Sequence, residues 1–106
     1  MMFPKVKKDN KKVIKELRSE HDCCERCGNM NNLEVAHVIS RGAGGIDMRE
    51  NLIVLCGKAS MSQGCHGANH RGEIKANELF KIIARREGVT AETCRKRVRR
   101  AMGYKV

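Results

Sequence analysis

Apolar residues recur at helical spacing near both ends of the chain and predict helices over residues 9–20 and 76–87. The apolar positions are Val13, Ile14 and Leu17 in the first segment and Leu79, Phe80, Ile82 and Ile83 in the second. Gly88 is expected to end the second helix, and Thr90 offers an N-cap for a further helix to about Met102. Predicted helices therefore flank the central part of the chain.

The central part predicts two strands followed by a helix. Leu33–Ile39 contains β-branched residues, and Asn51–Cys56 is a second apolar run that would return beside it. Between them, Ser40–Gly45 holds three glycines and is expected to be a loop, because glycine weakens regular structure. From Cys65 the pattern becomes helical through Ile74.

Length and charge narrow the range of functions. A chain of 106 residues with 3% aromatic residues can hold one small domain, which its six cysteines could staple. The formal charge of +10 favours a polyanionic partner. Residues 1–18 carry a net +5 and residues 81–106 a net +7, whereas residues 19–80 carry a net −2. Solubilising or disordered tails are the alternative explanation of such basic flanks.

No apolar run reaches membrane-spanning length, and residues 1–6 lack the apolar core of a signal peptide. We therefore expect no membrane association and a cytoplasmic location, where thiols stay reduced. Cysteine pairs in that setting indicate metal binding more than disulfides.

Four cysteines are spaced as ligands of one structural zinc ion. Cys24 and Cys27 are separated by two residues, which lets both sulfurs face one tetrahedral ion. Cys56 and Cys65 form a second pair, and the eight residues between them imply an extra loop. A disulfide pair or unrelated buried thiols are the alternatives.

Three further residues have no ligand role in this scheme. Cys23 could replace Cys24, but only Cys24 has the two-residue spacing to Cys27. Cys94 is alone on the last predicted helix and is expected to be a small buried residue. His21 is expected to be an exposed polar residue near a helix end.

Three histidines and one asparagine are predicted to converge. His66 and His70 lie four residues apart, so both imidazoles project from one face of a helix and can clamp a divalent ion. A single helical histidine is more often a packed core residue, but two at this spacing beside Cys65 favour a ligand role. His37 lies on the first strand and Asn51 opens the second, so the helix would bring its histidines opposite His37.

These segments together resemble the HNH nuclease motif, most closely that of short HNH endonucleases of bacteriophages and prophages. The stretches that carry the resemblance are Glu34-Val-Ala-His-Val-Ile-Ser-Arg-Gly-Ala-Gly-Gly45, Asn51-Leu-Ile-Val-Leu-Cys56 and Cys65-His-x-x-x-His70. The resemblance covers about residues 24–74. It implies an α+β fold, a small ββα-metal finger stabilised by a four-cysteine zinc site and flanked by basic helices.

The resemblance also implies residue roles. His37 matches the general base that takes a proton from the attacking water, and it forms a catalytic set with Asn51 and His66. His66 and His70 match ligands of the catalytic divalent ion, and Asn51 matches a residue that binds this ion or braces the loop. An imidazole base and one Lewis-acid ion suit phosphodiester hydrolysis. Two imidazoles suit zinc, nickel, cobalt or manganese better than magnesium.

Ala36 departs from the family pattern. Many members carry His or Asp at this position, directly before the general base, as a ligand of the catalytic ion. Either the helical histidines and Asn51 form a weak site that fills with DNA, or the enzyme is impaired, or its ligand set includes His37. Asp47 is a further candidate ligand.

Several basic residues are candidates for DNA contacts. Arg41 in the glycine-rich loop and Arg71 after the helical histidines could hold the scissile phosphate, with ordinary surface charge as the alternative. The last predicted helix carries a basic run suited to phosphate contacts: Arg95, Lys96, Arg97, Arg99 and Arg100. The Lys5–Lys15 stretch suits the same role. We expect DNA binding that is non-specific or weakly specific.

The sequence thus predicts a metal-dependent DNA endonuclease. Its single HNH domain would comprise a basic N-terminal helix (1–20), a zinc-bound core (21–75) and basic C-terminal helices (76–106). A zinc-stabilised nucleic-acid-binding module without catalysis and a small RNA-binding or ribosome-associated zinc protein are the alternatives. The family adds expectations of a phage or prophage origin, a bacterial cytoplasm and a role beside the phage terminase. The oligomeric state is expected to be a monomer or a homodimer.

Overall fold

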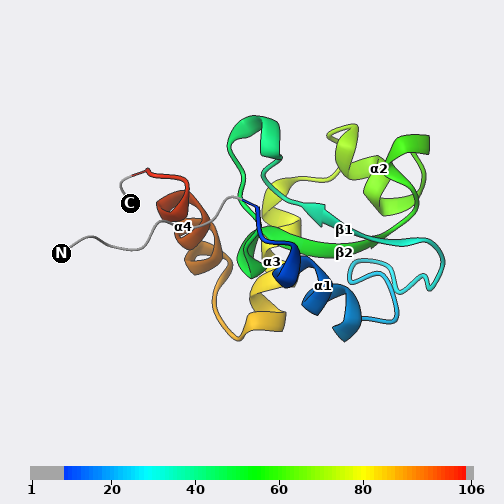
Figure 1. The fold of residues 1–106 in the computed structure, drawn as a ribbon, viewed down its shortest axis with the longest axis horizontal. Helices are drawn as coiled ribbons and strands as arrows, with labels where there is room; N and C mark the ends of the chain where they lie inside the picture. The colour runs from blue at the N-terminus through cyan, green and yellow to red at the C-terminus, as the bar shows by residue number, and fades with distance from the viewer. Residues whose placement is uncertain (1–8, 105–106) are drawn as a thin grey trace.

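The computed structural model describes residues 9–104; residues 1–8, the start of the predicted basic N-terminal segment, and residues 105–106 lie outside this range. Its helices and strands are α1 (Lys11–Glu20), β1 (Leu33–His37), β2 (Leu52–Cys56), α2 (Gly64–His70), α3 (Ala76–Glu87) and α4 (Ala91–Ala101) (Figure 1). Short 3-10 turns in the connections are η1 (Arg41–Ala43), η2 (Arg49–Asn51) and η3 (Ala59–Met61). The predicted α+β class is confirmed, because helices pack around an antiparallel pair of strands.

The sheet is small and covered on both faces. β1 and β2 pair antiparallel in a register that sets Leu33 against Cys56. All five residues of β2 are buried, as expected for a strand with packing on both sides. Because side chains alternate along a strand, Ile53 and Leu55 point to one face and Val54 to the other.

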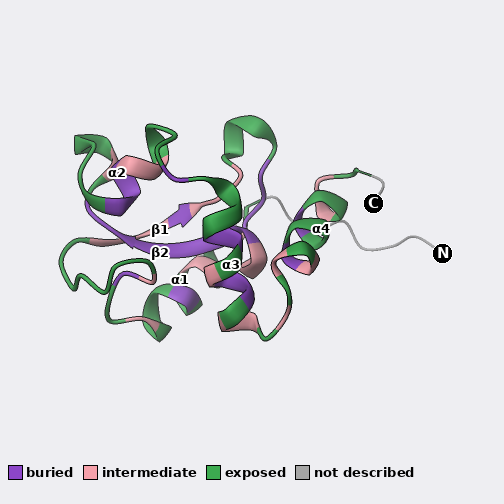
Figure 2. Ribbon diagram, turned by 180° about the vertical axis from the view of Figure 1, so that it is seen from behind, coloured by how far each residue is buried: buried purple, intermediate pink, exposed green. Residues whose placement is uncertain are grey.

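Different helices cover the two faces. Ile53 and Leu55 belong to the main hydrophobic core together with the inner sides of α3 and α4. The core residues of these two helices are Leu79, Phe80, Ile83, Ala84, Cys94 and Val98. α1 contacts both strands, and its Leu17 is fully buried although it lies outside that core cluster. Figure 2 shows the buried residues gathered on the strands and on the inner sides of the helices.

Two predictions about the chain are wrong. Helix α2 ends at His70 and does not continue through Ile74, because Gly72 takes a left-handed conformation with a φ of 73°. Ile74 is still buried, since the connection returns to the core before α3 begins. The second concerns His21, which was expected to be exposed. It is half-buried after the end of α1, and its ring lies 3.2 Å from the carboxylate of Glu25.

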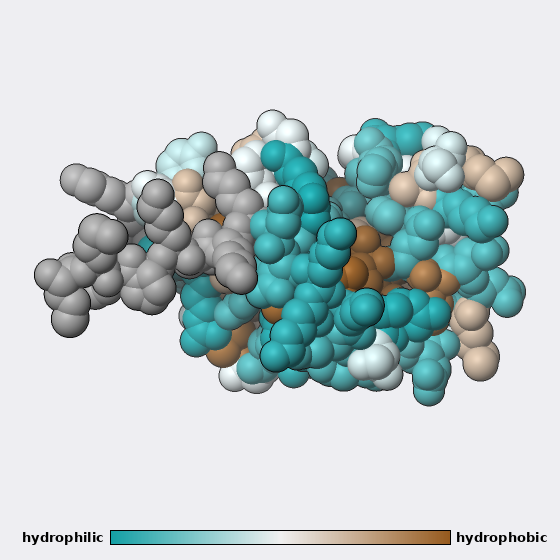
Figure 3. Space-filling model, in the orientation of Figure 1, coloured by the Kyte–Doolittle hydropathy of each residue, from teal (hydrophilic) through white to brown (hydrophobic). Residues whose placement is uncertain are grey.

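The surface of the face that carries α1 is mainly hydrophilic (Figure 3). The surface-exposed side of α1 contributes three lysines to this face: Lys11, Lys12 and Lys15. Among residues 9–104 there is no helix long and apolar enough to cross a membrane.

Candidate active site and metal centre

Four cysteines from three segments meet at one point. The sulfur atoms of Cys24, Cys27, Cys56 and Cys65 lie within 4.8 Å of one another, and those of Cys27 and Cys56 are 3.5 Å apart. The first two lie in the connection after α1, the third ends β2 and the fourth lies in the first turn of α2. Cys23 is exposed and stays outside the cluster. The four residues predicted from their spacing are therefore the ones that the fold brings together.

The cluster fits a tetrahedral zinc ion. Zinc–sulfur bonds of about 2.3 Å place the sulfurs of such a site about 3.8 Å apart, and the observed separations extend to 4.8 Å. Burial is the largest cause that raises the pKa of the Cys65 thiol to about 12. A hydrogen bond with the backbone of Asn29 is the largest cause that lowers the pKa of Cys27 to about 7. A cation among the sulfurs supplies the charge that favours four thiolates.

Polar contacts connect the cysteine turn, residues 24–27, to α3. The guanidinium of Arg26 lies 3.5 Å from the sulfur of Cys65 and 2.6 Å from the carboxylate of Glu78. The carboxylate of Glu25 accepts a hydrogen bond of 2.9 Å from Arg86, whose side chain is mostly buried. The cysteine turn is therefore fastened to α3 by two arginine–glutamate pairs.

The segment between Cys56 and Cys65, called here the inter-ligand loop (residues 57–64), closes on itself. The carbonyl of Lys58 accepts a hydrogen bond of 3.1 Å from the N–H of Gln63. A Cβ on Gly57 would lie 2.1 Å from the backbone oxygen of Gln63, so this close approach requires glycine. The extra loop predicted from the cysteine spacing therefore has a tight base, which brings its two cysteines together.

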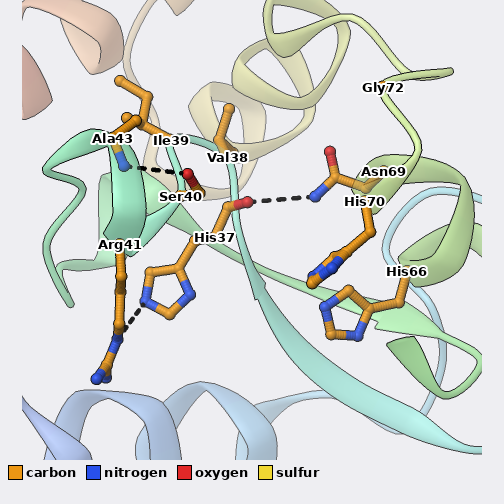
Figure 4. A pocket seen from close by; sticks show the side chains of 10 residues that line it. All are labelled: His37, Val38, Ile39, Ser40, Arg41, Ala43, His66, Asn69, His70 and Gly72. Atoms are coloured by element: carbon orange, nitrogen blue, oxygen red, sulfur yellow. Dashed lines mark hydrogen bonds between the residues drawn. The ribbon is translucent and has the colours of Figure 1, made fainter. Parts of the chain in front are cut away.

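A pocket of about 660 Å³ brings three histidines together. His37 contributes from the end of β1, and His66 and His70 contribute from α2 (Figure 4). Arg41 of η1 and Asn69 of α2 also line it. The ring centroids of His66 and His70 are 4.8 Å apart, and the rings are nearly perpendicular.

The pocket extends around the open edge of β1. Glu34 contacts α2 through His66, whereas His37 contacts the start of α1 through Asp47. These two strand residues are three apart, so alternation places them on opposite faces. Figure 4 shows β1 passing between His37 on one side and His66 and His70 on the other. Imidazoles therefore line the pocket from both sides of β1.

Glu34 orients the ring of His66. Its carboxylate lies 2.8 Å from Nδ1 of His66 and also accepts a hydrogen bond of 3.0 Å from the backbone N–H of Ala59. The remaining ring nitrogen is left for the side of the pocket that holds His70 (Figure 4). Burial is the largest cause that lowers the pKa of His66, against the opposing effect of Glu34. The neutral ring that results is the form that binds a metal ion.

Asp47 holds the ring of His37 from the other side. One carboxylate oxygen lies 2.6 Å from Nε2 of His37. The other oxygen lies 2.7 Å from the guanidinium of Arg41 and 2.8 Å from the backbone nitrogen of Asn10. Since both oxygens of this buried carboxylate are engaged, its placement does not support the candidate role of Asp47 as a metal ligand.

Asn51 braces the loop beneath the pocket. It is fully buried, and its Oδ1 accepts a hydrogen bond of 2.8 Å from the N–H of Ile39. Its Nδ2 donates to the carbonyl oxygens of Ile39 and Ile46, both at 3.0 Å. Asn51 does not line the pocket. Of the two roles that the resemblance implies, this placement favours bracing over metal binding.

The histidine pocket offers few ligands from the protein. Within residues 9–104, the cysteine cluster is the one group of three or more candidate side chains that could hold a metal ion. Ala36 is buried and carries no ligand atom. His66 and His70 can thus supply two ligands and leave the other positions to water or phosphate, as in an open catalytic site.

The predicted DNA-contact residues are placed unevenly. Arg41 lines the pocket, whereas Arg71 pairs with Glu73, contacts the carbonyl of Ser62 at 2.6 Å and does not line it. The basic residues predicted on the last helix are exposed on α4: Arg95, Lys96, Arg97, Arg99 and Arg100. Arg71 is therefore displaced from the site, and the α4 residues form a separate basic surface.

Residues 24–72 match the family model described as HNH endonuclease, a span that holds the cysteine cluster and the three pocket histidines. This segment is an HNH domain. The HNH family implies a nuclease that acts on DNA. No curated protein and no solved structure matches the chain.

Sequence reasoning missed the residues that hold the HNH histidines in place. The sequence pattern predicts no role for Glu34, although a single acidic residue in an apolar strand is a signal for a partly buried polar contact. For Asp47 the pattern indicates only a ligand role. Asn69, whose Nδ2 donates to the carbonyl of His37 at 3.2 Å, has no signal beyond its position beside His70.

Proposed function

We propose that this protein is a metal-dependent DNA endonuclease that hydrolyses phosphodiester bonds. The observation that carries the proposal is the convergence of His37, His66 and His70 on one pocket inside an HNH domain. The nuclease unit comprises the core at residues 21–75 and the basic segments at residues 1–20 and 76–106.

In the proposed reaction, His37 is the general base. It takes a proton from a water molecule at the edge of β1, and that water attacks the phosphorus of the scissile bond. The bond between phosphorus and the 3′ oxygen breaks, and the leaving oxygen takes a proton from solvent, which gives 5′-phosphate and 3′-hydroxyl ends. Arg41 at the pocket rim neutralises a non-bridging phosphate oxygen. Asn51 supports the loop that carries Arg41 and so keeps the rim in place.

The pocket fits a divalent ion held by His66 and His70. When bound there, such an ion supplies neutralisation of the phosphate and of the leaving oxygen. Manganese, nickel, cobalt or zinc suit two imidazoles better than magnesium. The four-cysteine cluster fits a structural zinc ion with no open position, so its role is to hold the fold.

DNA is proposed to run from the pocket toward α4. A Cβ on Gly44 would lie 3.4 Å from the side chain of Met102, so the loop after Arg41 lies beside the end of α4. The loop that follows Arg41 and the C-terminal end of α4 are thus neighbours on the fold. Phosphate contacts along the basic surface of α4 bind without reading sequence.

A nucleic-acid-binding module without catalysis is the second candidate. Ala36 favours it, because the position that ligates the catalytic ion in many HNH nucleases carries no ligand atom here. The two candidates differ in whether His37 matters for cleavage, and one assay separates them.

The assay is plasmid cleavage by protein that keeps its structural zinc, with magnesium, manganese, nickel, cobalt or zinc added separately. We expect metal-dependent nicking or linearisation by wild type and a rate lower by about 10²–10⁴-fold in His37→Ala. His21→Ala, which alters the histidine outside the pocket, is the matched control. Equal cleavage by His37→Ala and wild type would refute the catalytic proposal. Retardation of DNA on a gel without cleavage under any ion would favour the binding module.

The biological setting is proposed at the level of the family. It comprises a phage or prophage origin, a bacterial cytoplasm and work beside a phage terminase. A monomer would nick one strand at a time, whereas a homodimer with two pockets could make a double-strand break.

A further inference from the structure

Asp47 connects the proposed general base to two other segments of the chain. Its carboxylate is fully buried and contacts His37 at the end of β1, Arg41 of η1 and the backbone nitrogen of Asn10 at the start of α1. Asn10 is also the N-cap of α1, since its side chain accepts a hydrogen bond from the N–H of Val13. The carboxylate therefore lies where the N-terminal helix meets the pocket.

Asp47 is an anion at neutral pH. Burial acts to raise its pKa, but the hydrogen bonds from His37 and Asn10 and the charge of Arg41 outweigh burial and hold the pKa below its ordinary value. An ionised carboxylate can only accept hydrogen bonds. The nitrogen of His37 that lies 2.6 Å away must therefore donate, which puts a proton on Nε2.

The contact with Arg41 does not change this assignment. Its Nε lies 3.5 Å from the same ring nitrogen of His37, at the limit of a hydrogen bond, whereas Asp47 is 0.9 Å closer. With Nε2 protonated, Nδ1 of the neutral ring carries the lone pair. Figure 4 shows this second nitrogen on the side of the ring that faces His66 and His70.

We propose that Asp47 is a positioning residue that fixes His37 in the tautomer with its proton on Nε2, so that Nδ1 is the atom that accepts the proton from water. The inference rests on the proposed nuclease function. It adds which nitrogen of His37 accepts the proton and which residue holds the ring in that tautomer. Asp47 does not touch the reacting water or phosphate; it acts through His37. The backbone N–H of Asn10 and the guanidinium of Arg41 keep the carboxylate in place.

Asp47→Asn is the informative substitution because it keeps the shape and changes the donors. An amide has one accepting oxygen, but the carboxylate accepts from three groups on its two oxygens. Turning the amide nitrogen toward His37 leaves Arg41 and Asn10 with their acceptor. His37 would then accept at Nε2 and carry its proton on Nδ1, with no lone pair facing the pocket.

The experiment is ¹⁵N NMR of the histidine rings in zinc-loaded protein, combined with cleavage kinetics. We expect wild-type His37 to be protonated on Nε2 and Asp47→Asn to shift the proton to Nδ1. We expect kcat to fall by about 10²–10⁴-fold with little change in KM, by analogy with the loss of the correct tautomer in a serine-protease triad. Asp22→Asn, an exposed aspartate outside the pocket, is the matched control.

The two readouts separate the inference from the function it rests on. A wild-type ring protonated on Nδ1, or the same tautomer in wild type and Asp47→Asn, would overturn the role of Asp47 whatever the cleavage result. The wild-type spectrum decides even if the variant fails to fold. The predicted tautomers in a protein that cuts no DNA would support the positioning role and reject the nuclease function.

Discussion

The cysteine cluster and the histidine pocket meet at adjacent residues, Cys65 and His66, yet they are built in opposite ways. The cluster gathers four sulfurs from three segments and points them at one another. The pocket gathers three imidazoles around the edge of a strand. A carboxylate contacts two of these rings: Asp47 contacts His37, and Glu34 contacts His66. One arrangement is closed and could hold an ion, and the other is an open pocket.

This difference shows how α2 can serve both sites. Its first turn carries Cys65 toward the cluster, and the next residue, His66, faces the pocket. Because Cys65 belongs to the cluster, the cluster also holds the start of the helix that carries His66 and His70. The two sites are therefore linked through one short helix.

The largest expected effect comes from opening the closed site. Cys65→Ser removes one of four thiolates, and we expect loss of the folded state at room temperature, because structural zinc contributes roughly 10–16 kcal/mol in zinc-finger peptides. Bound zinc measured by atomic emission and helix content measured by circular dichroism would both fall.

Cys23→Ser is the matched control, since this exposed thiol lies next to the cluster without joining it. It should keep its zinc and its melting temperature. Full zinc content in Cys65→Ser would contradict the assignment of the four ligands.

An intermediate effect is expected from loosening one carboxylate behind the pocket. Glu34→Gln weakens the support of His66, and loss of such a partner typically costs about 10–100-fold in metal affinity. We expect the concentration of manganese or nickel needed for half-maximal cleavage to rise by about tenfold, while the structural zinc stays bound.

Glu16→Gln, an exposed glutamate on α1, controls for the loss of one negative charge. An unchanged metal requirement in Glu34→Gln would mean that this carboxylate serves only the backbone of Ala59, its other partner.

The smallest effect is expected from adding a candidate ligand atom beside the histidine pocket. Ala36→Asp adds a carboxylate on the face of β1 that carries Glu34, and we expect the metal requirement to fall by up to about tenfold. The substitution also puts a carboxylate into the hydrophobic core that includes Ala36, with an expected cost of about 3–5 kcal/mol in the free energy of unfolding when no ion neutralises it. Metal titration of cleavage and urea unfolding measure the two effects separately.

Ala36→Ser adds a polar atom of similar size without a charge and is the control for crowding. If Ala36→Asp and Ala36→Ser need the same metal concentration, position 36 does not face the ion.

Local patterns were enough to predict the elements and the residues that meet. The apolar stripes predicted α1 and α3, the N-cap signal at Thr90 predicted α4, and the spacing of the cysteines predicted the cluster. The order of strand, loop, strand and helix predicted that His37 would meet His66 and His70 at one pocket. The helices and the cysteine pairs depend on residues that are close in sequence. The meeting of the histidines depends on the antiparallel pairing of β1 and β2.

The supporting contacts depend on geometry that the sequence does not show. Glu34 meets His66 across 32 positions, and the backbone of Asn10 meets Asp47 across 37. Such pairs follow from how a helix packs on a strand edge. The early end of α2 and the displacement of Arg71 have a nearer cause, since one left-handed glycine after the helix redirects the chain.

The closed base of the inter-ligand loop has a consequence for engineering. Its outer residues are not equally open to change, because the N–H of Ala59 donates to Glu34 and the carbonyl of Ser62 accepts from Arg71, which leaves Met61 between them as the position for an insertion. Met61 at its tip is 60% exposed. A recognition peptide inserted there would stand a few residues from His66, beside the pocket that we propose cuts DNA, and could direct the proposed cleavage to a chosen target.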